Sequence, residues 1–200
     1  MWSQESLFGS STLHVSMKDL IDAIFQCKAP GGDIPIISHK LGKDFYHSVQ
    51  PQEVCNVLQS FSKEDLECVE SIVLAQPGDE EIKLRAHGEF VQFDNQIRVY
   101  ALKMTKKKDG QQVFKLQCQG KTAKGKVREV TPDEAHDRVL SDVVPHEVGH
   151  AISRCNLGNK FQPGDAEEET ARKFSIEYRK QHGIKERETY LGGFCAIMRE

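Results

Sequence analysis

Residues 146–150 read His-Glu-Val-Gly-His, and this stretch constrains the fold more than any other part of the chain. On an α-helix, side chains four positions apart lie on one face, one above the other. His146 and His150 can then direct two imidazole nitrogens towards one point. Imidazole suits Zn²⁺, which favours four tetrahedral ligands. The spacing therefore predicts a closely packed helix that carries two ligands of one metal ion.

Glu147 directly follows the first of these histidines and is expected to project towards the open coordination position. A carboxylate there can accept a proton from a water that the metal activates. A catalytic zinc site has three protein ligands, so one ligand must come from elsewhere in the chain.

Three consecutive glutamates, Glu167, Glu168 and Glu169, are the candidates for that ligand. They begin a helix predicted over residues 166–181. The apolar stripe of this helix consists of Ala171, Phe174 and Tyr178. Glu168 precedes Ala171 by three positions and Glu167 precedes it by four, so either can face the buried side, whereas Glu169 points away into solvent. The phase favours Glu168 and leaves Glu167 as the alternative.

These motifs resemble those of the glutamate-zincin peptidases, most of all the small ImmA/IrrE-type group. The resemblance rests on His-Glu-Val-Gly-His-Ala at 146–151 and on the pattern E-x-x-A-x-x-F at 168–174. It implies one Zn²⁺ per chain with the ligands His146, His150 and Glu168, and Glu147 as general base. It also implies limited cleavage of a partner protein, a DNA-binding transcriptional repressor, in bacterial stress or phage defence. Where many such peptidases carry further acidic or amide residues, this chain has Thr170 and Arg172, so the group that orients a histidine must come from elsewhere.

The pattern of elements predicts a single α+β domain over residues 1–200, with N-terminal helices, a small and mostly antiparallel sheet, and the two metal-binding helices. The expected parts are a helical N-terminal part (1–60), the sheet (71–118), the metal-binding helices (131–181) and a tail without an assigned role (184–200). One N-terminal helix is expected over 16–27, and another begins at Pro51. In the resembling family an edge strand pairs with the substrate backbone, and we expect that edge within 88–102.

Composition sets the class and the expected compartment. The chain has 38% hydrophobic and 28% charged residues and a net charge of −3, which by itself implies neither a nucleic-acid nor a membrane partner. It contains no run of eighteen apolar residues and no evident signal peptide. The six cysteines form no CxxC pair, so the sequence predicts reduced thiols and a cytoplasmic protein.

A basic strip between residues 98 and 128 contains ten Lys or Arg residues and one acid, Asp109. Its prominent members are Lys106, Lys107, Lys108, Lys121, Lys124, Lys126 and Arg128. One interpretation is a solvated hairpin whose edge the lysines protect. The other is a surface for an acidic partner or nucleic acid. The second interpretation supports an alternative function, a non-enzymatic or latent zinc-containing regulatory module.

Two further hypotheses concern the chemistry of the site. Cys118 precedes a Gly- and Lys-rich loop, where a thiolate is favoured, and it can serve as an inhibitory fourth zinc ligand. The competing interpretation is an inert, half-buried cysteine. Three tyrosines, Tyr100, Tyr178 and Tyr190, are candidates for stabilising an oxyanion, and the sequence does not choose among them.

Overall fold

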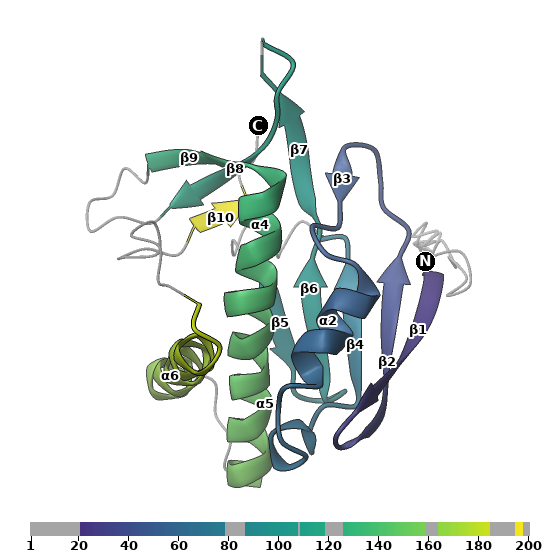
Figure 1. Cartoon of the computed structure of the whole chain (residues 1–200), viewed down its shortest axis with the longest axis vertical. Coiled ribbons are helices and arrows are strands. Elements are labelled where there is room, and N and C mark those ends of the chain that lie inside the picture. Colours follow the sequence, from purple (N-terminus) through teal and green to yellow (C-terminus); the bar gives the residue numbers. More distant parts are fainter. Residues whose placement is uncertain are drawn as a thin grey trace, which may run out of the picture.

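The computed structural model describes residues 21–78, 87–107, 109–118, 126–158, 164–184 and 195–197. The fold is α+β, with two sheets, a long helical rod beside them and a C-terminal helix packed on that rod (Figure 1). The strands are β1 (Ile21–Ala29), β2 (Gly32–His39), β3 (Phe45–Tyr46), β4 (Ser71–Ala75), β5 (Gly88–Val91), β6 (Gln96–Tyr100), β7 (Leu102–Lys106), β8 (Gln112–Cys118), β9 (Lys126–Val130) and β10 (Cys195–Ile197). The helices are α2 (Pro51–Leu58), the 3₁₀ turn η1 (Glu64–Leu66), α4 (Pro132–Arg138), the π-helical segment η2 (Val139–Val143), α5 (Val144–Leu157) and α6 (Asp165–Gln181).

The first sheet is mixed, with the strand order β1-β2-β4-β6-β5. Its central strands β2, β4 and β6 are parallel, and the two outer strands β1 and β5 are antiparallel to their neighbours. The expectation of a mostly antiparallel sheet is therefore wrong for this sheet and right for the second one, in which β3, β7, β8, β9 and β10 pair antiparallel. Among the described strands, β5 forms the edge of the first sheet within 88–102. That this edge pairs with a substrate stays a prediction.

The N-terminal part differs from the helices that the sequence predicted. Residues 21–29 form strand β1 instead of the end of a helix over 16–27, and residues 16–20 lie outside the described part of the chain. A tight hairpin joins β1 to β2, in which Gly32 adopts a φ of 136° that favours glycine. Pairing with β2 therefore overrides the helical spacing of the apolar residues. Helix α2 forms as predicted, with Pro51 at its first turn.

One face of the first sheet is covered by α2 and α5, which lie side by side across it in Figure 1. Val54 and Leu58 from α2 and Val144 and Val148 from α5 are buried in the same core as the inward side chains of the sheet. This burial fixes α5 against the sheet, and it directs the opposite side of α5 towards α6.

Helices α4 and α5 form one continuous rod, interrupted only by η2. Thr131 caps its start, accepting from the backbone N–H of Glu134, while the Glu134 side chain accepts from the backbone N–H of Thr131. Pro145 lies inside the rod and has no N–H to donate to the carbonyl of Ser141. Just before the proline, the helix widens to a π turn, in which the N–H of Val144 donates to the carbonyl of Val139. The π segment thus accommodates the proline without ending the helix.

Two disulfides connect distant parts of the chain. Cys27 of β1 is bonded to Cys55 of α2, and Cys68 is bonded to Cys155 near the end of α5. The prediction of reduced thiols is therefore wrong for these four cysteines, because a scattered spacing in the sequence conceals pairs that folding brings together. Among the described residues, none of the helices combines the length and the apolar character that crossing a membrane requires.

Candidate metal centre

The close crossing of α5 and α6 brings the predicted ligands together. Gly149 of α5 lies against Ala171 of α6, and a Cβ atom built on Gly149 would meet the Ala171 Cα at 2.7 Å and the Phe174 Cβ at 3.2 Å. A residue larger than glycine cannot fit this contact without displacing backbone. The glycine between the two histidines thus allows the first turn of α6 to approach them.

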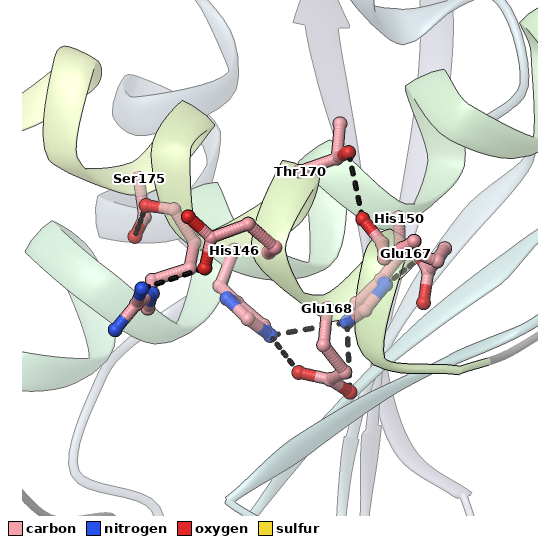
Figure 2. A network of polar contacts seen from close by, with 9 residues as sticks. His146, His150, Glu167, Glu168, Thr170 and Ser175 are labelled. Atoms are coloured by element: carbon pink, nitrogen blue, oxygen red, sulfur yellow. Dashed lines mark hydrogen bonds and ion pairs between the residues drawn. The ribbon is translucent and has the colours of Figure 1, made fainter.

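Three donor atoms converge at this crossing, as Figure 2 shows. The Nε2 atoms of His146 and His150 are 3.0 Å apart. The Glu168 carboxylate lies 3.4 Å from the Nε2 of His146 and 3.6 Å from the Nε2 of His150. The structure therefore places both histidines and Glu168 around one point.

These separations can be tested against the geometry of zinc. Ligands that bind Zn²⁺ tetrahedrally at about 2.0–2.1 Å are separated from one another by about 3.3–3.4 Å. The three observed separations lie on both sides of that value. Two imidazoles and a carboxylate are also a typical donor set for catalytic zinc. The residues thus fit a zinc ion, and Glu147 belongs to the same group of potential ligands.

Glu147 is 5% exposed and lies where α5 contacts β5. A Cβ atom on Gly88, the first residue of β5, would come within 3.1 Å of the Glu147 Cγ. Burial raises the pKa of Glu147 to about 8, and the neighbouring His146 opposes this rise. Burial disfavours the ionised form of a carboxyl group, and it brings the pKa of Glu147 close to neutral pH, where a group can both accept and release a proton.

The two histidines differ in their electrostatic surroundings. Burial, together with the neighbouring His146, lowers the pKa of His150 to about 4, so its ring is neutral at pH 7. Burial is the largest single influence on His146 and acts to lower its pKa, but Glu168, Glu147 and Asp142 together outweigh it and the pKa is raised. Contact with His146 in turn lowers the pKa of Glu168. A neutral imidazole and an ionised carboxylate are the forms that bind metals.

The three glutamates at the start of α6 have different surroundings. Glu167 is 8% exposed and contacts the Nδ1 of His150, on the other side of the ring from the Nε2 atom that faces Glu168. Glu168 is half exposed and faces both Nε2 atoms. Glu169 pairs with Arg172 and Lys173 of its own helix, in line with the prediction that it points away. Glu167 is the more buried of the first two, because a spacing of four residues from Ala171 stays closer in helical phase than a spacing of three. The choice of Glu168 over Glu167 as the metal ligand stays a prediction.

The two tyrosine candidates that the structure describes lie away from the site. Ile97 and Val99 of β6 face the core that α5 covers, whereas Tyr100 is buried in a cluster on the opposite face with Val73 and Ala75. Tyr178 stacks on Phe61, about 15 Å along α6 from Glu168 by helical rise. Tyr190 lies outside the described residues.

The basic strip and Cys118 belong mainly to the second sheet. Lys107 pairs with Glu129 at 2.8 Å, and Arg98 pairs with Glu89 at 3.1 Å. Lys108, Lys121 and Lys124 lie outside the described residues, as do the side chains of Lys106, Lys126, Arg128 and Cys118. The backbone register places Cys118, the last residue of β8, opposite Cys195 of β10.

Comparison with known proteins gives no relative for this chain: no protein-family model, no curated protein and no solved structure matches it.

Proposed function

We propose that this protein is a zinc-dependent endopeptidase that makes limited cleavages in a partner polypeptide. One observation carries the proposal: the Nε2 atoms of His146 and His150 are 3.0 Å apart, the two oxygens of Glu168 lie 3.4 and 3.6 Å from them, and the buried carboxylate of Glu147 lies alongside. A purely structural metal site has no need of a buried base beside its ligands.

The chain's own residues account for positioning and proton transfer. His146, His150 and Glu168 would hold the zinc ion. Bound there, zinc would polarise the scissile carbonyl and acidify a water. Glu147 accepts the proton of the attacking water and passes it to the leaving amine. Because Glu147 is buried, few bulk water molecules can reach its carboxylate apart from the attacking water.

The edge strand β5 supports a polypeptide as the substrate. β5 is the outermost strand of its sheet, it pairs only through its β6 side among the described strands, and it begins beside Glu147. An extended substrate can add to such an edge through backbone hydrogen bonds. Backbone pairing at β5 would place a peptide bond next to the general base, with little demand on the substrate's side chains.

The disulfides bear on where this activity would take place. Disulfides form and persist in oxidising compartments and are rare in the cytosol. Cys68–Cys155 anchors the helix that carries both histidines, so the oxidised form is the one in which the site is held. We therefore propose an extracytoplasmic polypeptide as the substrate, in preference to the cytoplasmic repressor that the family resemblance implies.

The alternative of a latent or non-enzymatic module has less support. Two of the strip's described cations, Lys107 and Arg98, are each paired with a glutamate and are therefore less available to an acidic partner. This pairing agrees with the interpretation of a solvated hairpin. The Cys118 hypothesis stays a separate proposal, and the metal analysis below tests it.

The first experiment is elemental analysis of the wild type and of Glu168→Gln and Cys118→Ser proteins. We expect one zinc per wild-type chain, loss of zinc in Glu168→Gln, and no change in Cys118→Ser. Zinc that is weakened in Cys118→Ser and retained in Glu168→Gln would indicate a closed, latent site instead. A wild type without zinc would refute the peptidase proposal.

The second experiment separates catalysis from metal binding. Glu147→Gln should retain zinc and lose activity by about 10²- to 10⁴-fold, because only the proton transfer is removed. A mixture of denatured proteins, analysed for new peptide termini by mass spectrometry, serves as the substrate pool. Cleavage that is equal in the wild type and in Glu147→Gln would show that the site described here does not perform it.

A further inference from the structure

Glu167 is a buried carboxylate to which the ligand set gives no role. Only 8% of its surface is exposed, and its Oε1 atom contacts the Nδ1 atom of His150. Burying a carboxylate is costly unless it is hydrogen-bonded or paired. The contact with His150 provides that compensation, and it ties the first turn of α6 to the middle of α5.

This contact selects one form of the His150 ring. An ionised carboxylate can only accept hydrogen bonds, so the Nδ1 atom must carry the proton that it donates to Glu167. In a neutral ring the lone pair is then on Nε2, the atom that faces His146 and Glu168. Metal-binding histidines commonly donate their second N–H to a carboxylate in this way, which fixes the ring and makes it a stronger ligand.

The other histidine has no such partner in the described part of the chain. His146 makes its hydrogen bond and ion pair through Nε2, to His150 and Glu168. The positions at which the resembling peptidases supply a further carboxylate are Thr170 and Arg172 here. Thr170 bonds to the backbone of its own helix, and Arg172 pairs with Glu169. Of the two histidines, His150 is thus the one whose Nδ1 contacts a carboxylate among the described residues.

We propose that Glu167 is a positioning residue of the metal centre, which holds His150 in the Nδ1–H tautomer while the adjacent Glu168 binds the metal. The two neighbouring glutamates then have different roles: the buried Glu167 accepts from Nδ1 of His150, and the half-exposed Glu168 lies beside Nε2, where the metal would bind. The proposal rests on the proposed function, because it assigns Glu167 to the same zinc site. It explains why the chain can dispense with a carboxylate at positions 170 and 172.

The test compares Glu167→Ala with Glu167→Gln and with the matched control Glu169→Ala, which changes the glutamate of the same turn that pairs with Arg172 and Lys173. Zinc dissociation constants are measured by competition with a chromophoric chelator. Glu167→Ala should weaken zinc binding by about 10- to 100-fold. Glu167→Gln keeps an acceptor oxygen and should show a smaller loss, and Glu169→Ala should bind zinc as the wild type does.

A second readout separates positioning from a general structural role. Long-range ¹⁵N–¹H NMR spectra of the histidine rings report the tautomer of His150 directly, in both metal-free and zinc-loaded protein. We expect the Nδ1–H form in the wild type, a mixture of tautomers in metal-free Glu167→Ala, and partial restoration in Glu167→Gln. Thermal unfolding of the metal-free variants shows how much of any loss reflects stability alone.

The outcomes are distinct. Unchanged zinc affinity in Glu167→Ala, or weakened affinity with an unchanged His150 tautomer, would overturn the positioning role. A wild type that binds no zinc would overturn the proposed function, and the tautomer spectra of the metal-free proteins would still decide whether Glu167 orients His150.

Discussion

The contact between Gly149 and Ala171 allows a sharp test of how the two helices create the site. Substituting Gly149 by Ala places a methyl group 2.7 Å from the Ala171 Cα and 3.2 Å from the Ala171 carbonyl oxygen. Both are backbone atoms, so no side-chain rotation can relieve the overlap. Restoring ordinary contact requires the helices to separate by roughly 0.7 Å.

The two effects of Gly149→Ala on stability nearly cancel. Overpacking of this kind costs about 1–3 kcal/mol. Replacing glycine by alanine within a helix returns about 1 kcal/mol through helix propensity. We therefore expect the metal-free protein to lose only about 1 kcal/mol of unfolding free energy.

Metal affinity should respond much more strongly. Ligand distances in a genuine site lie within about 0.2 Å of their ideal values, so a shift of roughly 0.7 Å exceeds that tolerance. The first turn of α6 carries Glu168 and Glu167, and both move with the helix. Zinc affinity should fall at least about tenfold, as it does when a residue that orients a ligand is lost.

The assay combines urea unfolding of the metal-free proteins with zinc competition against a chelator. Gly31→Ala is the matched control, since a Cβ atom there meets nothing closer than 3.6 Å. If Gly149→Ala bound zinc as tightly as the wild type, the helix crossing would not set the ligand spacing, and the reasoning would fail.

Two further predictions concern parts of the fold outside the ligand set. Replacing both Cys68 and Cys155 by Ala removes a disulfide that spans 87 residues. The free energy of unfolding should fall by about 4 kcal/mol relative to the wild type with both disulfides intact, as measured by urea denaturation. For His136, burial acts to lower the pKa, but the contacts with Glu53 and Asp137 together outweigh this and the pKa is raised. The pKa of Glu53 is lowered chiefly by the backbone of Gln50. The stabilisation from His136 is thus present below its unfolded pKa and is lost as the pH rises through its folded pKa. His136→Gln should therefore make the free energy of unfolding depend less on pH across neutrality, and an unchanged pH dependence would contradict this.

The sequence predicted the helical half of the site well, because the signals there are local. The capping box at Thr131, the spacing of His146 and His150, and the glutamates before Ala171 all act within one or two turns of helix. Local hydrogen bonds and helical phase decide such elements, so they can be derived without knowledge of the tertiary fold.

The sequence failed where distant segments decide the structure. Residues 21–27 have apolar positions at helical spacing, yet they form a strand because β2 is available to pair with them. The Cys27–Cys55 and Cys68–Cys155 bonds join segments 28 and 87 residues apart, which no spacing pattern indicates. Helical phase alone brings Glu167 closer to the buried stripe of α6, but only the packing of α6 on α5 shows that Glu167 contacts the Nδ1 side of His150 and Glu168 the Nε2 side.

The π segment η2 lies beside a local sequence feature, Pro145, and also affects how the helical rod packs on the two sheets. An uninterrupted α-helix through 132–157 would leave the carbonyl of Ser141 without a donor, because Pro145 has no N–H. The wider turn is visible in the bond from the N–H of Val144 to the carbonyl of Val139, five residues apart.

One extra residue in a turn rotates everything that follows by about 100° about the helix axis. The part before η2 can therefore pack on the second sheet, through Ala135, while the part after it turns Val144 and Val148 to the first sheet and the histidines to α6. The proline next to the histidine motif thus helps to set the face on which the two ligands lie, even though it contacts no metal.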